Sequence, residues 1–205
     1  MTTNHSNISP LLEFLTSSYN KPLSDDLRQI LHDRVYERQV RAGTLLVFPG
    51  QIVDRDIIGF MKKGFCRCYY IDNCGNDITR SFVPEGDFIF TELRLVGEEA
   101  QFAVEACEDC NILILDLPHI LESAGGNMPL QNEMYRIYIA LLEQIIKEKV
   151  MRDSSFLMKD AQGRYEEFCE NFPEVEQRAK KRHIASYLGI TSVSLSRIRR
   201  KMRDL

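Results

Sequence analysis

Long apolar runs are missing from this chain of 205 residues. No stretch approaches the roughly 20 consecutive apolar residues that a membrane-spanning helix needs, so we predict no membrane contact. Residues 1–10 are polar and contain no apolar run, which excludes a secretory signal there. We therefore expect a cytoplasmic protein whose six cysteines stay reduced.

Histidine is also scarce, and the histidines follow no metal-ligand spacing. No nucleophile–base motif stands out, so we predict no enzymatic activity, no metal and no cofactor. The region 35–117, which reads as strands, contains no histidine at all. This disfavours one alternative function, a cupin-like β-barrel enzyme, because its strands would have to carry a set of His and Glu metal ligands. The histidines are His5, His32, His119 and His183.

The cysteines include two close pairs. Cys66 and Cys68 share one face of a predicted strand, and Cys107 and Cys110 flank a predicted turn. Four thiolates would suit a metal site if the two pairs met. Buried reduced thiols are the simpler interpretation, and the sequence leaves redox or metal chemistry at these four cysteines open.

Acidic residues are almost absent from the C-terminal end. From Arg178 to Leu205 there are nine Lys and Arg and one acid, Asp204, a net charge of +8. The whole chain carries −4, so residues 1–177 carry about −12 by subtraction. A basic tail on an acidic body indicates a phosphate-binding module, and double-stranded DNA is the partner that we predict.

The first 127 residues predict two short helices followed by an antiparallel barrel. The helices begin at the expected caps Ser9 and Ser24. The apolar residues then change to a strand period, and turn compositions such as 72–76 separate the segments. About eight short strands of this kind are typical of a β-roll or jelly roll. The predicted strand segments are 40–48 with a break at 42–43, 57–62, 65–71, 78–83, 88–90, 102–106 and 112–117, with one helical turn at 92–96.

A long helix is predicted after the short helix Leu117–Ala124. No helix breaker occurs from Leu130 to about Phe156. The apolar stripe of this segment is too wide for one partner, so we expect it to pack on its own barrel and on a second copy of the chain. The alternative is a helix buried only in its own chain. The expected dimer contacts are Met134, Ile137, Tyr138, Leu141 and Ile145.

The segment 182–202 has the pattern of a helix-turn-helix. A short helix with one apolar face precedes Gly189, where the turn needs a residue that tolerates positive φ. Thr191 is a good cap for the second helix. Arg197 lies one turn past that cap, from where its guanidinium can bind a guanine through two hydrogen bonds. The predicted outward face of the second helix holds Ser192, Val193, Ser196, Arg197 and Arg200.

These elements, in this order, resemble the Crp/Fnr family of bacterial transcription regulators over nearly the whole chain. The most specific segments are Ile184–Arg197 and the lead-in Arg164–Pro173, and the lead-in is similar to a Bacteroidetes-type branch. The resemblance implies an α+β fold with a cyclic-nucleotide-binding-like β-roll in 1–127, a dimerisation helix in 128–157 and a helix-turn-helix in 158–205. The helix-turn-helix would be winged-helix-like with the wing short or absent.

The resemblance also implies partners and residue roles. A homodimer would bind a palindromic operator, contact RNA polymerase and respond to an unknown small-molecule effector. Val193 stands where some members have an acidic residue that reads cytosine, so a different operator is expected. The base-reading positions are Ser192, Val193 and Arg197, and the phosphate-contacting positions are Arg182, Thr191, Ser194 and Arg200.

The implied effector pocket departs from that of cyclic-nucleotide-binding members. Those members hold the phosphate with a Gly-Glu pair and a later Arg-Ser/Thr pair. Here Glu92 fills the first position and Gln101 lies in the second, without an arginine to neutralise a phosphodiester and with Glu98 and Glu99 to repel one. We therefore expect an effector other than cyclic AMP. Relatives that sense oxygen place their cluster ligands near the N-terminus, where this chain has no cysteine before Cys66.

A non-DNA-binding interaction module that keeps this fold is the remaining alternative function. The net charge of +8 in 178–205 and the presence of Arg197 favour DNA binding over it. The sequence therefore predicts a sequence-specific DNA-binding regulator.

Overall fold

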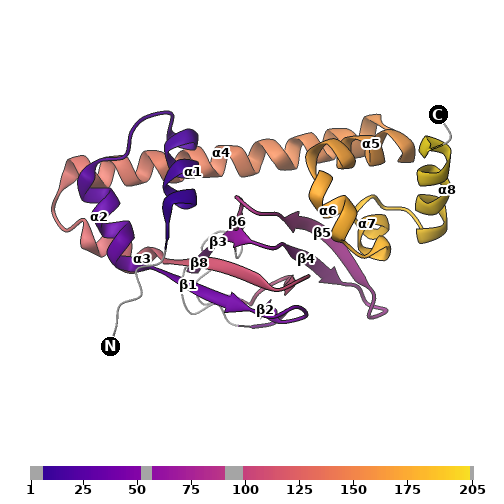
Figure 1. Cartoon of the computed structure of the whole chain (residues 1–205), viewed down its shortest axis with the longest axis horizontal. Helices are drawn as coiled ribbons and strands as arrows, with labels where there is room; N and C mark the ends of the chain where they lie inside the picture. Colours follow the sequence, from indigo (N-terminus) through magenta and orange to yellow (C-terminus); the bar gives the residue numbers. More distant parts are fainter. Residues whose placement is uncertain (1–6, 52–56, 91–98, 204–205) are drawn as a thin grey trace.

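The computed structural model describes residues 7–51, 57–90 and 99–203. Three helices lie at one end, the strands lie under the middle, and four short helices form the other end, with the long helix α4 running along all of them (Figure 1). The helices are α1 (Ser9–Tyr19), α2 (Asp25–Arg34), α3 (Leu117–Ser123), α4 (Met128–Met158), α5 (Ala161–Asn171), α6 (Pro173–Arg178), α7 (Lys181–Tyr187) and α8 (Ser192–Arg203). The strands are β1 (Val35–Val40), β2 (Leu45–Val47), β3 (Ile57–Lys63), β4 (Cys66–Ile71), β5 (Asp77–Val83), β6 (Phe88–Phe90), β7 (Ala103–Ala106) and β8 (Cys110–Asp116).

The strands form two antiparallel four-stranded sheets, with the orders β1-β8-β3-β6 and β2-β7-β4-β5. Strand β8 has a nearly all-apolar sequence because it is buried on both faces. Its side chains alternate between two cores, because Ile112 and Ile114 point into the roll while Leu113 and Leu115 pack under the helices. The predicted antiparallel β-roll is confirmed.

The helices α1, α2, α3 and α4 cover the outer face of the first sheet. Phe14 of α1 meets Phe60 of β3 and Phe88 of β6 edge to face, with ring centroids 5.1–5.7 Å apart in this group of three. Ser24 caps α2 as predicted, because its Oγ accepts from the N–H of Leu27 at 3.3 Å. The backbone N–H of Ser24 donates to Glu133 of α4 at 2.8 Å, which fixes α2 against the long helix.

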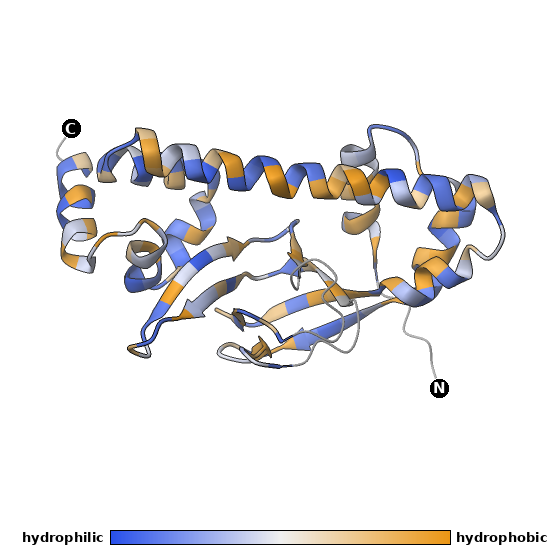
Figure 2. Ribbon diagram, turned by 180° about the vertical axis from the view of Figure 1, so that it is seen from behind, coloured by the Kyte–Doolittle hydropathy of each residue, from blue (hydrophilic) through white to orange (hydrophobic). Residues whose placement is uncertain are grey.

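Hydrophobic residues recur along the whole of helix α4 (Figure 2), and they lie on two of its faces. One apolar face packs on α1 and the roll, where Met134, Ile137 and Leu141 are 7% exposed each. Three of the expected dimer contacts are therefore buried in the chain's own core, and contact with a second copy stays a prediction. The other two, Tyr138 and Ile145, are half-buried. No helix among the described residues is long and apolar enough to cross a membrane.

A second apolar stripe of α4 faces away from the roll. Its side chains are 53–60% exposed at Ile139, Ile146 and Val150. The sequence pattern correctly showed a stripe too wide for one partner, but it could not show which half the chain itself would bury. The exposed members of this stripe are Ile139, Ile146, Val150 and Leu157.

Several predicted boundaries differ from the structure. Strand β1 extends from Val35 because it pairs with β8 along its whole length. Helix α6 was not among the predicted elements; Pro173 is tolerated in its first turn and Arg178 suits its last. Ser9 lies inside α1 rather than at its cap, and its N–H donates to the side chain of Asn7 at 3.0 Å. The helical turn predicted at 92–96 lies outside the described residues.

Candidate nucleic-acid interface

The turn between α7 and α8 has the predicted geometry. Gly189 has φ +67°, in the left-handed region that favours glycine. A Cβ at this position would also lie 3.1 Å from Cε1 of Phe156, so a side chain would strain the turn twice. Thr191 caps α8 as predicted, because its Oγ1 accepts from the N–H of Ser194 at 3.1 Å.

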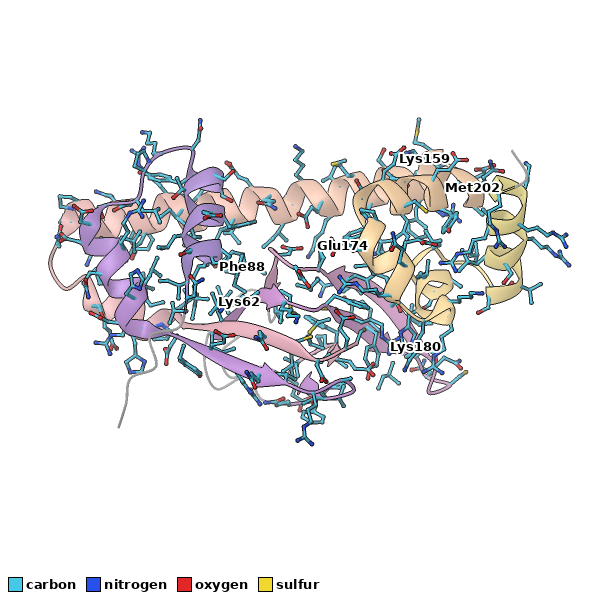
Figure 3. The ribbon with its side chains drawn as sticks, in the orientation of Figure 1. Lys62, Phe88, Lys159, Glu174, Lys180 and Met202 are labelled. Atoms are coloured by element: carbon cyan, nitrogen blue, oxygen red, sulfur yellow. The ribbon has the colours of Figure 1, made fainter. Side chains whose placement is uncertain are left out.

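A small core orients α8. Leu195 is fully buried and packs with Ile184 of α7, with Leu188 just after α7 and with Phe168 of α5. Burial of this side turns the opposite side of α8 to solvent, and nitrogen-tipped side chains extend there away from the rest of the molecule (Figure 3). The five residues predicted for the outward face of α8 are all exposed, as are Lys201 and Arg203 near its end. The five are Ser192, Val193, Ser196, Arg197 and Arg200.

The predicted DNA-contacting residues differ in exposure and in the hydrogen bonds that they already form within the chain. Arg182 is exposed on α7, where its Nε donates to Nε2 of His183 at 3.1 Å. Ser194 is half-buried, and its hydroxyl lies 2.9 Å from that of Thr191, so both hydroxyls also serve the helix cap. The structure thus groups the predicted base-reading residues on one face of α8 and places Arg182 on the preceding helix.

Two arginines of the basic tail serve the fold instead of the exposed face. Arg199 forms an ion pair with Glu176 at 2.6 Å, and its Nε donates to the hydroxyl of Tyr165 at 2.9 Å. Burial, followed by the bond to Glu176, raises the pKa of Tyr165. Arg178 pairs with Glu108 in the turn between β7 and β8. Residue 199 follows the buried Leu195 by four positions, so helical spacing already placed it beside the inward face.

Helix α7 docks on the sheet through polar groups. Arg67 of β4 is 2% exposed, pairs with Asp77 at 2.9 Å and Glu105 at 2.8 Å, and stacks on the ring of Tyr69. His183 of α7 is 3% exposed beside this group. Burial, and then the charge of Arg67, lower the pKa of His183 to about 4, so the imidazole is neutral at pH 7.

Two other arginines hold the turn of the helix-turn-helix to the end of α4. Arg152 of α4 donates to the carbonyl of Tyr187 at 3.4 Å, and Arg164 of α5 donates to the carbonyl of Leu188 at 3.2 Å. Both guanidinium groups stack on Phe156 of α4, 5.1 and 4.9 Å from its centroid. We call these three residues the clamp. It joins the C-terminal part of α4 to the turn that precedes α8.

A cleft of about 880 Å³ lies between the roll, α4 and the helix-turn-helix. Arg80 of β5 lines it and lies 4.5 Å from the ring centroid of Phe102, so β5 brings an arginine beside the segment 100–103 that itself has none. Burial, and then the charge of Glu148 on α4, raise the pKa of Asp87 to about 7. Of the two predicted pocket residues, Gln101 is exposed and does not line the cleft, and Glu92 lies outside the described residues.

The two cysteine pairs do approach each other. Cys66 and Cys110 are fully buried neighbours, and the Cys110 thiol donates to the carbonyls of Phe65 and Glu108 at 3.6 and 3.2 Å. Cys68 is also buried in the roll, where burial raises its pKa to about 11. Burial also raises the pKa of Cys107 to about 12. Within the described residues, no group of three or more His, Cys, Asp or Glu side chains is arranged to hold a metal ion.

Comparison with known proteins gives structural neighbours only. No family model and no curated protein matches the sequence. The c-di-GMP-responsive global regulator CLP from Xanthomonas campestris matches 88% of this chain and 92% of its own, with a TM-score of 0.65 at 12% identity. FixK2 from Bradyrhizobium japonicum matches 83% of this chain and 85% of its own, with a TM-score of 0.64 at 19% identity.

A third structure carries the same fold. A Crp/Fnr-family transcriptional regulator from Eubacterium rectale matches 88% of this chain and 84% of its own, with a TM-score of 0.59 at 17% identity. These likenesses give no support to a Bacteroidetes-type branch. They extend over the roll, the long helix and the C-terminal helices, and so the chain has the α+β fold of these regulators.

Proposed function

We propose that this protein is a sequence-specific DNA-binding transcription regulator of the Crp/Fnr type. The observation that carries this proposal is the exposed face of α8, where Arg197 and Arg200 project from a helix whose other side is fixed by Leu195. Such a face fits the major groove, in which arginine reads guanine and short side chains allow close approach. Ser192 and Val193 at the start of α8 are short enough for that approach.

Pairing of two chains through α4 is part of the proposal. The exposed stripe at Ile139, Ile146 and Val150 would be covered by the same stripe of a second copy. Two α8 helices related by a two-fold axis would then read a palindromic operator. In this assignment 1–127 senses, 128–157 pairs and 158–205 reads DNA.

The cleft beside α4 is the effector site in this proposal. Its walls come from the roll, from α4 and from the helix-turn-helix, so a molecule bound there contacts all three parts. CLP responds to c-di-GMP, and Arg80 offers this chain one cation for an anionic ligand. We expect cyclic AMP not to bind at the position that the resemblance implies, beside segment 100–103, below the millimolar range, because this segment lacks the arginine and Glu99 adds negative charge. Calorimetry with cyclic AMP and c-di-GMP, repeated on Arg80→Ala, measures both expectations.

Selection of bound sequences from random DNA tests the function. The wild-type chain should enrich a palindromic site, and the double variant Arg197→Ala, Arg200→Ala should enrich none. The matched control is Arg38→Ala, Arg41→Ala, which removes the same charge from exposed positions in and just after β1. It should enrich the wild-type site. Selection with and without cell extract would show whether an effector is required.

Two results would overturn the proposal. One is recovery of unenriched DNA by the wild type under every condition. The other is equal loss of enrichment in both double variants, because a nonspecific charge effect would then explain the binding.

A further inference from the structure

A second pocket lies behind the wall of the cleft. Phe88 and Leu141 line both spaces, and Phe88 lies between α1 and the strands (Figure 3). The second pocket has a volume of about 180 Å³. Its other walls come from α1, α2, α3 and α4 and from the outer faces of β3 and β8. We call it the apolar pocket.

The lining of the apolar pocket is almost free of polar groups. Aliphatic side chains from α2 and α3, such as Leu27 and Ile120, face Met134 and Ile137 of α4. These four are 3–7% exposed, so they belong to the packed core rather than to a mobile surface. Among the described residues that line the pocket, the only polar side-chain groups are the hydroxyls of Tyr135 and Tyr138.

A space of this size and chemistry is unusual in a core. Protein interiors are close-packed and contain few voids larger than a water molecule. A water would need two to four polar partners, which these walls do not supply. An apolar cavity of about 150 Å³ in another protein stays dry and binds benzene, so 180 Å³ is enough for a small apolar molecule.

The pocket opens between α3 and α4. Leu121 is 38% exposed and Tyr135 is 55% exposed at this opening, Leu117 and Tyr138 beside them are half-buried, and the remaining lining side chains described are buried. The Tyr135 hydroxyl can therefore meet one polar group of a ligand whose apolar part fills the interior.

We propose that the apolar pocket is a ligand-binding site for a compact apolar molecule, the size of one aromatic ring and with at most one polar group. This site is separate from the effector cleft and needs no DNA binding. A molecule in the apolar pocket would restrict the motion of Phe88 and Leu141 on the pocket side. Both side chains also line the cleft on their other side.

Toluene and para-cresol are suitable probes for the full-length chain. Each should raise the melting temperature by about 2–4 °C near saturation. Each should also shift the methyl NMR signals of Met134 and Ile137, whereas the methyl signal of Ile71 on β4 should not move. Para-cresol should bind more tightly than toluene, because it can use the Tyr135 hydroxyl.

Two substitutions locate the binding. Leu121→Trp places a bulky ring at the partly exposed opening, and Ile120→Phe fills the interior, so both should abolish the temperature and NMR shifts. Ile71→Trp, at a side chain that is 53% exposed and outside the pocket, should keep them. If Ile120→Phe does not fold, Leu121→Trp alone decides.

The proposal is overturned if the wild type shows neither shift with saturating toluene or para-cresol. It is also overturned if Leu121→Trp binds both probes as the wild type does, because binding would then occur elsewhere. The proposed function survives either failure, since DNA selection does not involve this pocket.

Discussion

Ser186 of α7 accepts a hydrogen bond at its Oγ from the backbone N–H of Thr79 in β5, at a distance of 2.9 Å. The same hydroxyl points back to the carbonyl of Asp77 at 3.4 Å. Thr79 is 1% exposed, so its N–H has no ready access to water. One hydroxyl on the first helix of the helix-turn-helix therefore completes the edge of a strand 107 positions earlier in the chain.

Substitution of this hydroxyl should destabilise the whole chain. Ser186→Ala leaves the buried N–H of Thr79 without an acceptor, which costs about 1–3 kcal/mol. Urea denaturation should show the loss as a lower midpoint with an unchanged slope. Ser196→Ala is the control, because Ser196 is exposed and its hydroxyl donates to the carbonyl of Ser192 within α8. A change for Ser186→Ala no larger than that of the control would contradict the docking.

His183 should make stability depend on pH. Its pKa is lowered from 6.5 to about 4 by burial, and Arg67 and Arg182 oppose its protonation while Asp77 and Glu105 favour it. Between these pH values the unfolded chain binds the proton and the folded chain does not. Stability is therefore lost as pH falls from about 6.5 to 4, by roughly 2–3 kcal/mol from this group.

The variant His183→Gln isolates that effect. Asp87 acts in the opposite sense, because its raised pKa of about 7 makes the folded state bind the proton first. The measured quantity is thus the difference in unfolding free energy between variant and wild type across the series. The unfolding free energy of the variant should rise relative to that of the wild type as pH is lowered from 6.5 to 4. A difference that stays constant over this range would show that His183 is not held neutral.

Arg197 and Arg182 should fail in different ways in DNA binding. Arg197→Ala should cost about 1–3 kcal/mol and relax the preference at one base pair per half-site. Arg182→Ala should weaken all sequences alike and reduce the salt dependence by about one unit of slope. Binding to single-base operator variants at several salt concentrations separates the two. Uniform weakening by Arg197→Ala, with base preferences intact, would rule it out as a base reader.

The exposed stripe of α4 gives a prediction about self-association. Ile139→Asp and Ile146→Asp place charge on side chains that are 53% and 60% exposed, so the fold should survive while pairing is lost. Leu141→Asp, in the buried half of the helix, should instead cost about 2–5 kcal/mol of stability. Sedimentation together with circular dichroism measures both effects.

A matched control keeps this experiment specific. Ile71→Asp introduces the same charge at a side chain of β4 that is also 53% exposed, and it should leave the mass unchanged. A wild-type chain that sediments as a monomer at micromolar concentration, or Ile146→Asp that still pairs, would refute pairing through this stripe.

Local sequence patterns were sufficient to predict the strands and α8. The strand period of β8, the glycine at 189 and the cap at Thr191 are each set by neighbours in the chain, so the sequence shows them directly. Tertiary contacts decide the rest. Arg199 looks like part of a basic face until Glu176 and Tyr165 are folded against it.

The cleft and the apolar pocket were outside the reach of sequence reasoning for a related reason. Each is a space between elements far apart in the chain, and no single segment carries its pattern. Arg80 belongs to a strand distant in sequence from segment 100–103, and only the pairing of β4 with β5 and β7 brings the two together. A search for an arginine within that segment could not find it.

The clamp fixes the rotation of the helix-turn-helix about the α4 axis relative to the exposed stripe of α4. Arg152 and Phe156 hold the turn before α8 against one face of α4. Ile139 and Ile146 lie on another face of the same helix, at an angle about the helix axis that the residue spacing fixes. Inserting one residue between positions 146 and 152 would rotate the clamp relative to the exposed stripe by about 100° and shift it along the axis by about 1.5 Å. The number of residues between the two faces thus sets the orientation of α8, and an insertion would rotate α8 while leaving every side chain on its surface unchanged.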